Sequence, residues 1–171
     1  QFMPIIDYVG EEKGELLEKL VKQKKPKRAL EIGTLVGYSA IKIARNLPRD
    51  GKLMTLEINP EVAKIAAHNI KEAGLSNKVE IVVGPALKTI PNLKGKFDFV
   101  FIDAAKEQYL NYLLLLEKHK LLKNKAVIVA DNAKMFKDEM NDYLHYVRSS
   151  GKYRSTFYDF GFDGVEVSEK V

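Results

Sequence analysis

Residues 29–39 read ALEIGTLVGYS, and this stretch decides the fold. A short apolar strand from Ala29 to Ile32 runs directly into two glycines, Gly33 and Gly37, and a helix is expected from Ser39. Glycine lets the backbone turn tightly and lets its N–H groups approach a ligand near a helix N-terminus. The stretch therefore predicts the first strand and turn of a nucleotide-binding α/β sheet.

Three further apolar runs end at side chains that can hold a ligand. They are residues 52–57, which end at Glu57, residues 96–102, which are followed by Asp103, and residues 126–130, which are followed by Asp131 and Asn132. In an open α/β sheet, ligands bind outside the carboxyl ends of the strands. We therefore expect an enzyme that places a nucleoside-bearing cofactor and a divalent metal at one edge of the sheet.

The rest of the chain alternates between helical and extended patterns. Helices are expected at residues 11–23, 39–47, 60–73, 85–90, 106–118 and 136–149, and further strands at residues 79–83, 153–158 and 164–167. Asn59 is the expected N-cap of the third helix. The alternation predicts an α/β fold with a doubly wound, mostly parallel sheet, closed at the C-terminus by an antiparallel edge pair.

The composition narrows the classes of function. With 46% apolar and 30% charged residues, the 171-residue chain is expected to form one globular domain. The sequence has no cysteine, which excludes disulfides and thiolate metal sites. No apolar run approaches the ~20 residues that span a bilayer, so no membrane partner is expected and the default location is cytoplasmic.

Much of the positive charge lies in residues 22–28, which read KQKKPKR. A basic run can attract nucleic acid. The simpler interpretation is a solvated helix end, because cations are favoured near the C-terminal dipole and Pro26 stops the helix. No aromatic residue is interleaved for base stacking. We favour the helix end and keep RNA as an alternative partner.

Glu57 is the candidate residue for a ribose. It ends the second strand, where an acidic side chain can accept both hydroxyls of an unphosphorylated ribose; taken alone, it is equally well a solvated strand end. The glycines Gly33 and Gly37 give GxxxG rather than GxGxxG, which disfavours NAD. Ser39 is expected to cap the following helix and to donate to a carboxylate.

The sequence contains a series of short motifs: EIGTLVGYS at 31–39, EINP at 57–60, VVG at 82–84, FIDAAK at 101–106 and VADN at 129–132, with VGEEKG at 9–14, YVRSS at 146–150 and DGVE at 163–166. Together they resemble the catechol/caffeoyl-CoA class of S-adenosylmethionine-dependent O-methyltransferases. The resemblance covers nearly the whole chain. It implies the class I methyltransferase fold, which is Rossmann-like with seven strands, and S-adenosylmethionine as the cofactor.

The resemblance also implies which residues bind the cofactor. Gly33 and Ser39 line its methionine end, Val9 covers that end through its backbone, and Glu57 holds the ribose. The predicted cofactor-binding set is completed by neighbours in the same motifs: Gly37, Tyr38, Ile58, Ala86 and Asp103. The apolar stretch around Ala86 predicts apolar contacts with adenine.

A metal site is predicted from Asp103, Asp131 and Asn132. Three hard oxygen ligands from two strand ends suit Mg²⁺ or another hard divalent cation. From the pattern alone, a helix cap and a turn are the alternatives; the resemblance favours the metal. It also implies that Lys106 is the general base, and that the acceptor is a small aromatic molecule with two neighbouring hydroxyls.

The chain departs from the family at its N-terminus. It begins where the cofactor-covering helix begins, so we expect a single methyltransferase domain over residues 1–171 that lacks the family's first helices. Exposed apolar area left by those helices would favour a homodimer. Asp159 is a candidate for an acceptor-binding acid. Tyr109, Tyr112 and Phe136 are interpreted as packing residues rather than as pocket walls.

Three other functions are kept open. One is methylation of a hydroxylated uridine in tRNA, which the basic run at 22–28 would assist. Another is a non-catalytic module that holds the cofactor, which the intact set of Asp103, Lys106, Asp131 and Asn132 argues against. The last is an NAD-dependent oxidoreductase, which the glycine spacing argues against.

Overall fold

The computed structural model describes residues 3–171, with side chains from Glu11 onward. The strands are β1 (Arg28–Ile32), β2 (Lys52–Glu57), β3 (Val79–Val83), β4 (Phe97–Ile102), β5 (Leu122–Ala130), β6 (Tyr153–Asp159) and β7 (Gly164–Lys170). The helices are α1 (Met3–Lys24), α2 (Tyr38–Ala44), α3 (Pro60–Glu72), α4 (Ala86–Thr89), α5 (Tyr109–Lys118) and α6 (Asn141–Ser149), with 3₁₀ turns η1 (Ile90–Asn92) and η2 (Lys106–Gln108).

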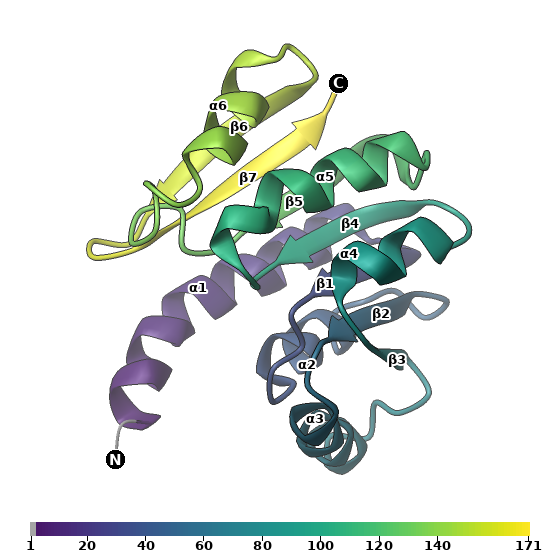
Figure 1. Ribbon diagram of the computed structural model, residues 1–171. Coiled ribbons are helices and arrows are strands. Elements are labelled where there is room, and N and C mark those ends of the chain that lie inside the picture. Colours follow the sequence, from purple (N-terminus) through teal and green to yellow (C-terminus); the bar gives the residue numbers. More distant parts are fainter. Residues whose placement is uncertain (1–2) are drawn as a thin grey trace.

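All seven strands form one sheet in the order β3-β2-β1-β4-β5-β7-β6 (Figure 1). Strands β1 to β5 are parallel, and β7 runs antiparallel to both β5 and β6. The predicted doubly wound sheet with an antiparallel edge pair is confirmed. The strand order reverses between β1 and β4, and such a switch point opens a crevice for ligands at the carboxyl ends of the strands.

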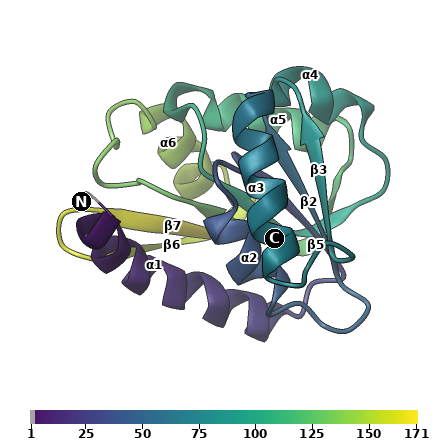
Figure 2. The ribbon, with the colours of Figure 1, turned by 90° about the horizontal axis from the view of Figure 1, so that it is seen from below.

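Helices cover both faces of the sheet (Figure 2). One apolar cluster joins α1, α2 and α3 to one face, with Ala29 and Phe99 pointing into it. The other joins α5 and α6 to the opposite face, with Leu30 and Val100 pointing into it. Neighbouring strand residues thus alternate between two cores, which explains why the central strands read as continuous apolar runs. No helix among residues 3–171 has the length and apolar character needed to cross a bilayer.

The predicted helix at 136–149 is wrong at its start, because α6 begins only at Asn141. The preceding turns are tied to the segment before β7, since Ala133 N–H donates to the Gly164 carbonyl and Met135 N–H donates to Asp163. Residues 132–141 then mix i→i−4 bonds, such as Phe136 N–H to the Asn132 carbonyl, with i→i−3 bonds, such as Asn141 N–H to the Asp138 carbonyl, and so form irregular turns rather than a continuous helix. The helix expected from residue 106 likewise starts as η2 before it becomes α5. In contrast, the predicted N-cap is confirmed: Asn59 Oδ1 accepts from two N–H groups of α3.

Candidate active site

Gly33 brings the ends of β1 and β4 together at the switch point. Its N–H donates to the Leu56 carbonyl over 2.9 Å, and the Asp103 N–H donates to the Ile32 carbonyl over 2.9 Å. Gly33 has φ +99°, and a Cβ there would lie 1.9 Å from the Asp103 carbonyl oxygen. Only glycine fits this position, so the turn after β1 lies directly against the strand end that carries Asp103.

Gly37, not Ser39, is the N-cap of α2. It has no side chain with which to cap the helix. Its left-handed conformation, with φ 90°, turns the chain into the helix instead. The prediction that Ser39 caps the helix is therefore wrong. The other part of the prediction, donation to a carboxylate, is confirmed, because the Ser39 hydroxyl donates to Glu31.

A cavity of about 550 Å³ lies at the carboxyl ends of β1, β4 and β5. Its walls come from α1, from the turn between Gly33 and Gly37 (the glycine-bounded turn), from α2 and from the segment before β7. Most of the lining is apolar, and the exposed side chains of Met135 and Phe162 stand at its edge. It brings together five residues that the sequence singled out: Tyr38, Ser39, Asp103, Asp131 and Asn132.

Glu57 lies beside this cavity rather than in its lining. Its side chain is buried, with Oε1 accepting from Leu35 N–H at 2.8 Å and Oε2 accepting from Asn59 N–H at 3.0 Å. The carboxylate thereby ties the glycine-bounded turn to the loop after β2. Of the other predicted cofactor residues, Ile58 is 67% exposed, and Ala86 is half-buried at the start of α4. Val9 lies in α1, but its side chain falls outside the described side chains.

Glu31 is a fully buried acid beneath the glycine-bounded turn, and no role was predicted for it. Its Oε1 accepts from the Thr55 hydroxyl at 2.7 Å, and the Thr34 and Thr55 hydroxyls lie 2.6 Å apart. Burial, with the negative charges of Asp103 and Glu57 adding to it, raises the pKa of Glu31 to about 8. A charged residue type inside an otherwise apolar strand was the sequence signal for this group.

Lys106 lies at the end of β4 and reaches back to Asp103. Its Nζ donates to Asp103 Oδ1 at 2.9 Å and to the Tyr109 hydroxyl at 3.1 Å. The Tyr109 hydroxyl donates in turn to the Asp131 carbonyl at 3.2 Å. The ammonium also lies 5.6 Å from the ring centre of Phe136. This chain of contacts fixes the position of the Lys106 ammonium, and the side chain as a whole is only 16% exposed.

Asp131 and Asn132 follow β5 and meet two residues that sequence reasoning left without a role. Lys13 Nζ lies 2.9 Å from Asp131 Oδ1 and also bonds to Asp163, while Asn132 Nδ2 donates to Asp163 at 2.8 Å. Burial and the nearby Asp103 raise the pKa of Asp131, against the opposing effect of Lys13. Burial alone would lower the pKa of Lys13, but its two carboxylate partners raise it above its usual value.

Within the described part of the chain, no group of three or more His, Cys, Asp or Glu side chains is arranged to hold a metal ion. The predicted metal ligands are not such a group, because only Asp103 and Asp131 offer carboxylates and the third ligand, Asn132, offers an amide oxygen. Asn132 has φ 68°, a left-handed conformation that is uncommon outside glycine. Strained backbone of this sort tends to occur at functional sites.

The positions of three aromatic residues and of Asp159 decide whether they line the cavity. Tyr109 and Tyr112 are buried in the core, as the packing interpretation predicted, and Phe136 packs against the same cluster. Asp159 is exposed and paired with Lys134 at 3.0 Å, so it does not line the cavity.

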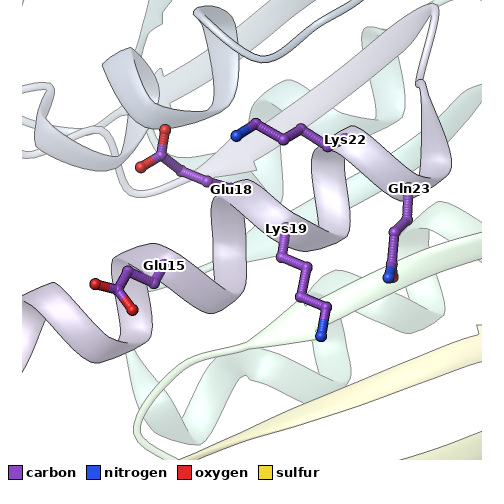
Figure 3. Close-up of a pocket in the computed structure, with 5 residues that line it drawn as sticks. All are labelled: Glu15, Glu18, Lys19, Lys22 and Gln23. Atoms are coloured by element: carbon purple, nitrogen blue, oxygen red, sulfur yellow. The ribbon is translucent and has the colours of Figure 1, made fainter.

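A second hollow of about 370 Å³ lies on the outer side of α1 (Figure 3). All five lining residues belong to this one helix: Glu15, Glu18, Lys19, Lys22 and Gln23. It contains none of the strand-end residues that the sequence predicts to act in binding or catalysis. We therefore assign the functional site to the larger cavity at the strand ends.

The sheet order, the glycine-bounded turn at its switch point and the acidic strand ends define a class I methyltransferase fold. The chain belongs to the O-methyltransferase family, whose sequence profile matches residues 3–142. It is 39% identical over 164 residues to catechol O-methyltransferase of Mus musculus, covering 93% of this chain and 61% of that protein. It is 44% identical over 125 residues to catechol O-methyltransferase of Mycobacterium tuberculosis, covering 72% and 56%.

The solved structures agree with this assignment. The O-methyltransferase from Bacillus cereus, solved in complex with SAH, superimposes with a TM-score of 0.85 at 31% identity, covering 93% of this chain and 80% of that one. A putative O-methyltransferase from Klebsiella pneumoniae gives a TM-score of 0.86 at 30% identity, with 93% and 80% covered. The chain spans about three fifths of the length of the mouse relative.

Proposed function

We propose that this chain transfers the methyl group of S-adenosylmethionine to a hydroxyl of a small aromatic acceptor with two neighbouring hydroxyls, assisted by a divalent cation. The proposal depends above all on one observation: Asp103, Asp131 and Asn132 face one apolar cavity, and Lys106 is held against Asp103 beside it. Relatives named catechol O-methyltransferase and a structural neighbour in complex with SAH support it.

The ends of β1 and β2 suit the cofactor. Gly33 and Gly37 let the turn pack closely against Asp103 and Ala66, and Tyr38 and Ser39 line the cavity just beyond it. When bound, S-adenosylmethionine supplies the sulfonium methyl group. We expect the ribose hydroxyls to donate to Glu57, which shares its oxygens with the two backbone N–H groups that already hold it in place.

The ends of β4 and β5 fit a hard cation. Asp103 and Asp131 offer carboxylate oxygens, Asn132 offers an amide oxygen, and Mg²⁺ prefers such ligands. Because Asp103 helps to raise the pKa of Asp131, a positive charge between the two would relieve their repulsion. When bound, the cation would supply a Lewis acid that polarises the acceptor hydroxyls.

Lys106 is proposed as the general base. As a neutral amine, Lys106 Nζ would accept the proton of the acceptor hydroxyl; a cation bound at Asp103 would favour that form, because it balances the carboxylate charge that the ammonium now neutralises. The deprotonated oxygen would then take the methyl group that bound S-adenosylmethionine supplies. Tyr109 contributes by position, because its hydroxyl holds Lys106 on one side and the Asp131 carbonyl on the other. A base held in place in this way typically contributes a factor of roughly 10² to 10⁴ to the rate.

The tRNA alternative is not favoured by the placement of the basic run at 22–28. The run lies at the C-terminal end of α1 and the start of β1, whereas the cavity lies at the opposite end of that strand. RNA bound to these lysines would have to extend along the length of β1 to reach Lys106. We expect methyl transfer that does not require RNA.

The test is methyl transfer from labelled S-adenosylmethionine to a panel of catechols and caffeoyl esters, with Mg²⁺ and again with a chelator. We expect turnover that the chelator abolishes. Turnover that survives chelation would contradict the metal role of Asp103, Asp131 and Asn132. Binding of the cofactor without any turnover on the panel would contradict the proposed acceptor class.

A further inference from the structure

Lys13 reaches from α1 into the edge of the cavity and joins three separate parts of the fold. Its Nζ bonds to Asp131 at the end of β5, at 2.9 Å, and to Asp163 in the turn before β7. Asp163 is almost fully buried and is itself fixed, because Asn132 Nδ2 and Met135 N–H donate to it. The ammonium is therefore held by carboxylates that have little freedom to move away.

The two halves of α1 are attached to the body of the protein in different ways. Beyond Lys13, the helix buries Leu17 and Val21 in the core it shares with α2. It is also held there by Glu18, which accepts two hydrogen bonds from Arg45 at 2.8 Å each. Lys13 is the polar attachment nearest the first turns of α1 among the described side chains. Those turns carry the segment that is expected to cover the cofactor.

We propose that Lys13 is a positioning residue that couples the helix over the cofactor to the metal site. It fastens the first half of α1 across the cavity, and it shares Asp131 with the cation that the site is proposed to bind. The metal and cofactor parts of this inference rest on the proposed function.

The shared carboxylate gives Lys13 opposite effects on the two ligands. Its positive charge beside Asp131 repels a divalent cation and occupies an oxygen that the cation would use, so Lys13 weakens metal binding. By holding α1 in place it strengthens cofactor binding, since the cover is already ordered when the cofactor arrives. A residue that only stabilises the fold would affect both affinities in the same direction.

The experiment compares Lys13→Met with Lys19→Met, a control on the exposed outer side of the same helix (Figure 3). Three quantities are measured: deuterium uptake of residues 3–14 in the metal-free protein, Mn²⁺ affinity by electron paramagnetic resonance, and S-adenosylhomocysteine affinity by calorimetry. For Lys13→Met we expect faster exchange, product affinity lowered roughly tenfold, and Mn²⁺ affinity raised roughly three- to tenfold. Lys19→Met should match wild type, and Lys13→Arg should keep the slow exchange.

Unchanged exchange and unchanged affinities in Lys13→Met would overturn the inference while leaving the proposed function intact. Loss of both affinities together would also overturn it, because that result indicates a structural role alone. If the wild-type protein binds no Mn²⁺, the metal part of the inference and the metal in the proposed function fail together. The deuterium uptake of residues 3–14 would then be the test of whether Lys13 holds the first half of α1 in place, since that measurement needs no metal.

Discussion

The two halves of the cavity edge hold their carboxylates in different ways. At the ends of β1 and β2, the described donors to Glu31 and Glu57 are neutral groups: hydroxyls for Glu31 and backbone N–H groups for Glu57. At the ends of β4 and β5, Asp103 and Asp131 each lie 2.9 Å from a lysine ammonium, which belongs to Lys106 and Lys13 respectively.

This difference shows how one sheet edge can serve two kinds of ligand. Backbone donors fix Glu57 before any ligand arrives, which suits recognition of hydroxyl groups, whereas Glu31 is fully buried and supports the turn from beneath. Ammonium groups on long side chains neutralise the acids of the second half, and another cation can take their place. We therefore expect the first half to bind the cofactor without a metal, and the second half to depend on cations.

Lys106→Ala should have the largest effect on turnover, and it alters the half of the edge at the ends of β4 and β5. Removing the base should lower kcat roughly 10² to 10⁴-fold. S-adenosylhomocysteine affinity should stay near that of wild type, because the contacts of Lys106 are with Asp103, Tyr109 and Phe136 rather than with the acids at the ends of β1 and β2. Turnover and calorimetry measured on the same preparation check this. Wild-type turnover in the variant would remove Lys106 from the mechanism.

Gly33→Ala should act on both halves, because Gly33 lies where they meet. The new Cβ would fall 1.9 Å from the Asp103 carbonyl oxygen at φ +99°, so we expect a loss of about 3 kcal/mol in the free energy of unfolding. Gly74→Ala is the matched control, since Gly74 has φ +74° with nothing within 4 Å of its Cβ position. Denaturant unfolding that shows equal losses in the two variants would contradict the close approach at Gly33.

Glu31→Gln should have a smaller effect that depends on pH. The carboxyl has an ordinary pKa of 4.5 and a folded pKa of about 8. Between these values the unfolded chain has lost the proton and the folded protein retains it, so the free energy of unfolding falls as pH rises, and it levels off above about pH 8. The uncharged glutamine removes this fall.

The pH effect is measured as the difference in unfolding free energy between Glu31→Gln and wild type at pH 5, 6.5 and 8. We expect the variant to gain on the order of 2 kcal/mol relative to wild type across this range. Glu15→Gln, an exposed position on α1, serves as the control. Parallel pH profiles for Glu31→Gln and wild type would show that Glu31 is ionised in the folded protein.

The fold followed from the sequence because its signals are local. Apolar runs predicted the strands, and Asn59 marked the start of α3 correctly. The doubly wound, mostly parallel sheet and its antiparallel edge pair followed from the alternation of elements and from the absence of a helix between the last two strands. The convergence of Asp103 and Asp131 on one cavity followed from the rule that parallel strands end at the same edge.

Contacts between distant residues could not be predicted in this way. Lys13 and Asp163 are 150 positions apart, and nothing in either neighbourhood shows that a lysine of α1 would reach the turn before β7. Ser39 was misread because serine favours N-caps in general, whereas the left-handed Gly37 already turns the chain into α2. The late start of α6 was also missed, because residues 136–140 form irregular turns with mixed i→i−3 and i→i−4 bonds that the apolar spacing does not distinguish from a helix.

The most direct test of the division between the two halves is Asp131→Ala, with Mn²⁺ binding followed by electron paramagnetic resonance and S-adenosylhomocysteine binding by calorimetry. We expect the Mn²⁺ site to be lost, while the product binds the metal-free variant about as well as it binds the metal-free wild type. Mn²⁺ bound as tightly as in wild type, or product binding lost together with the metal, would contradict the account.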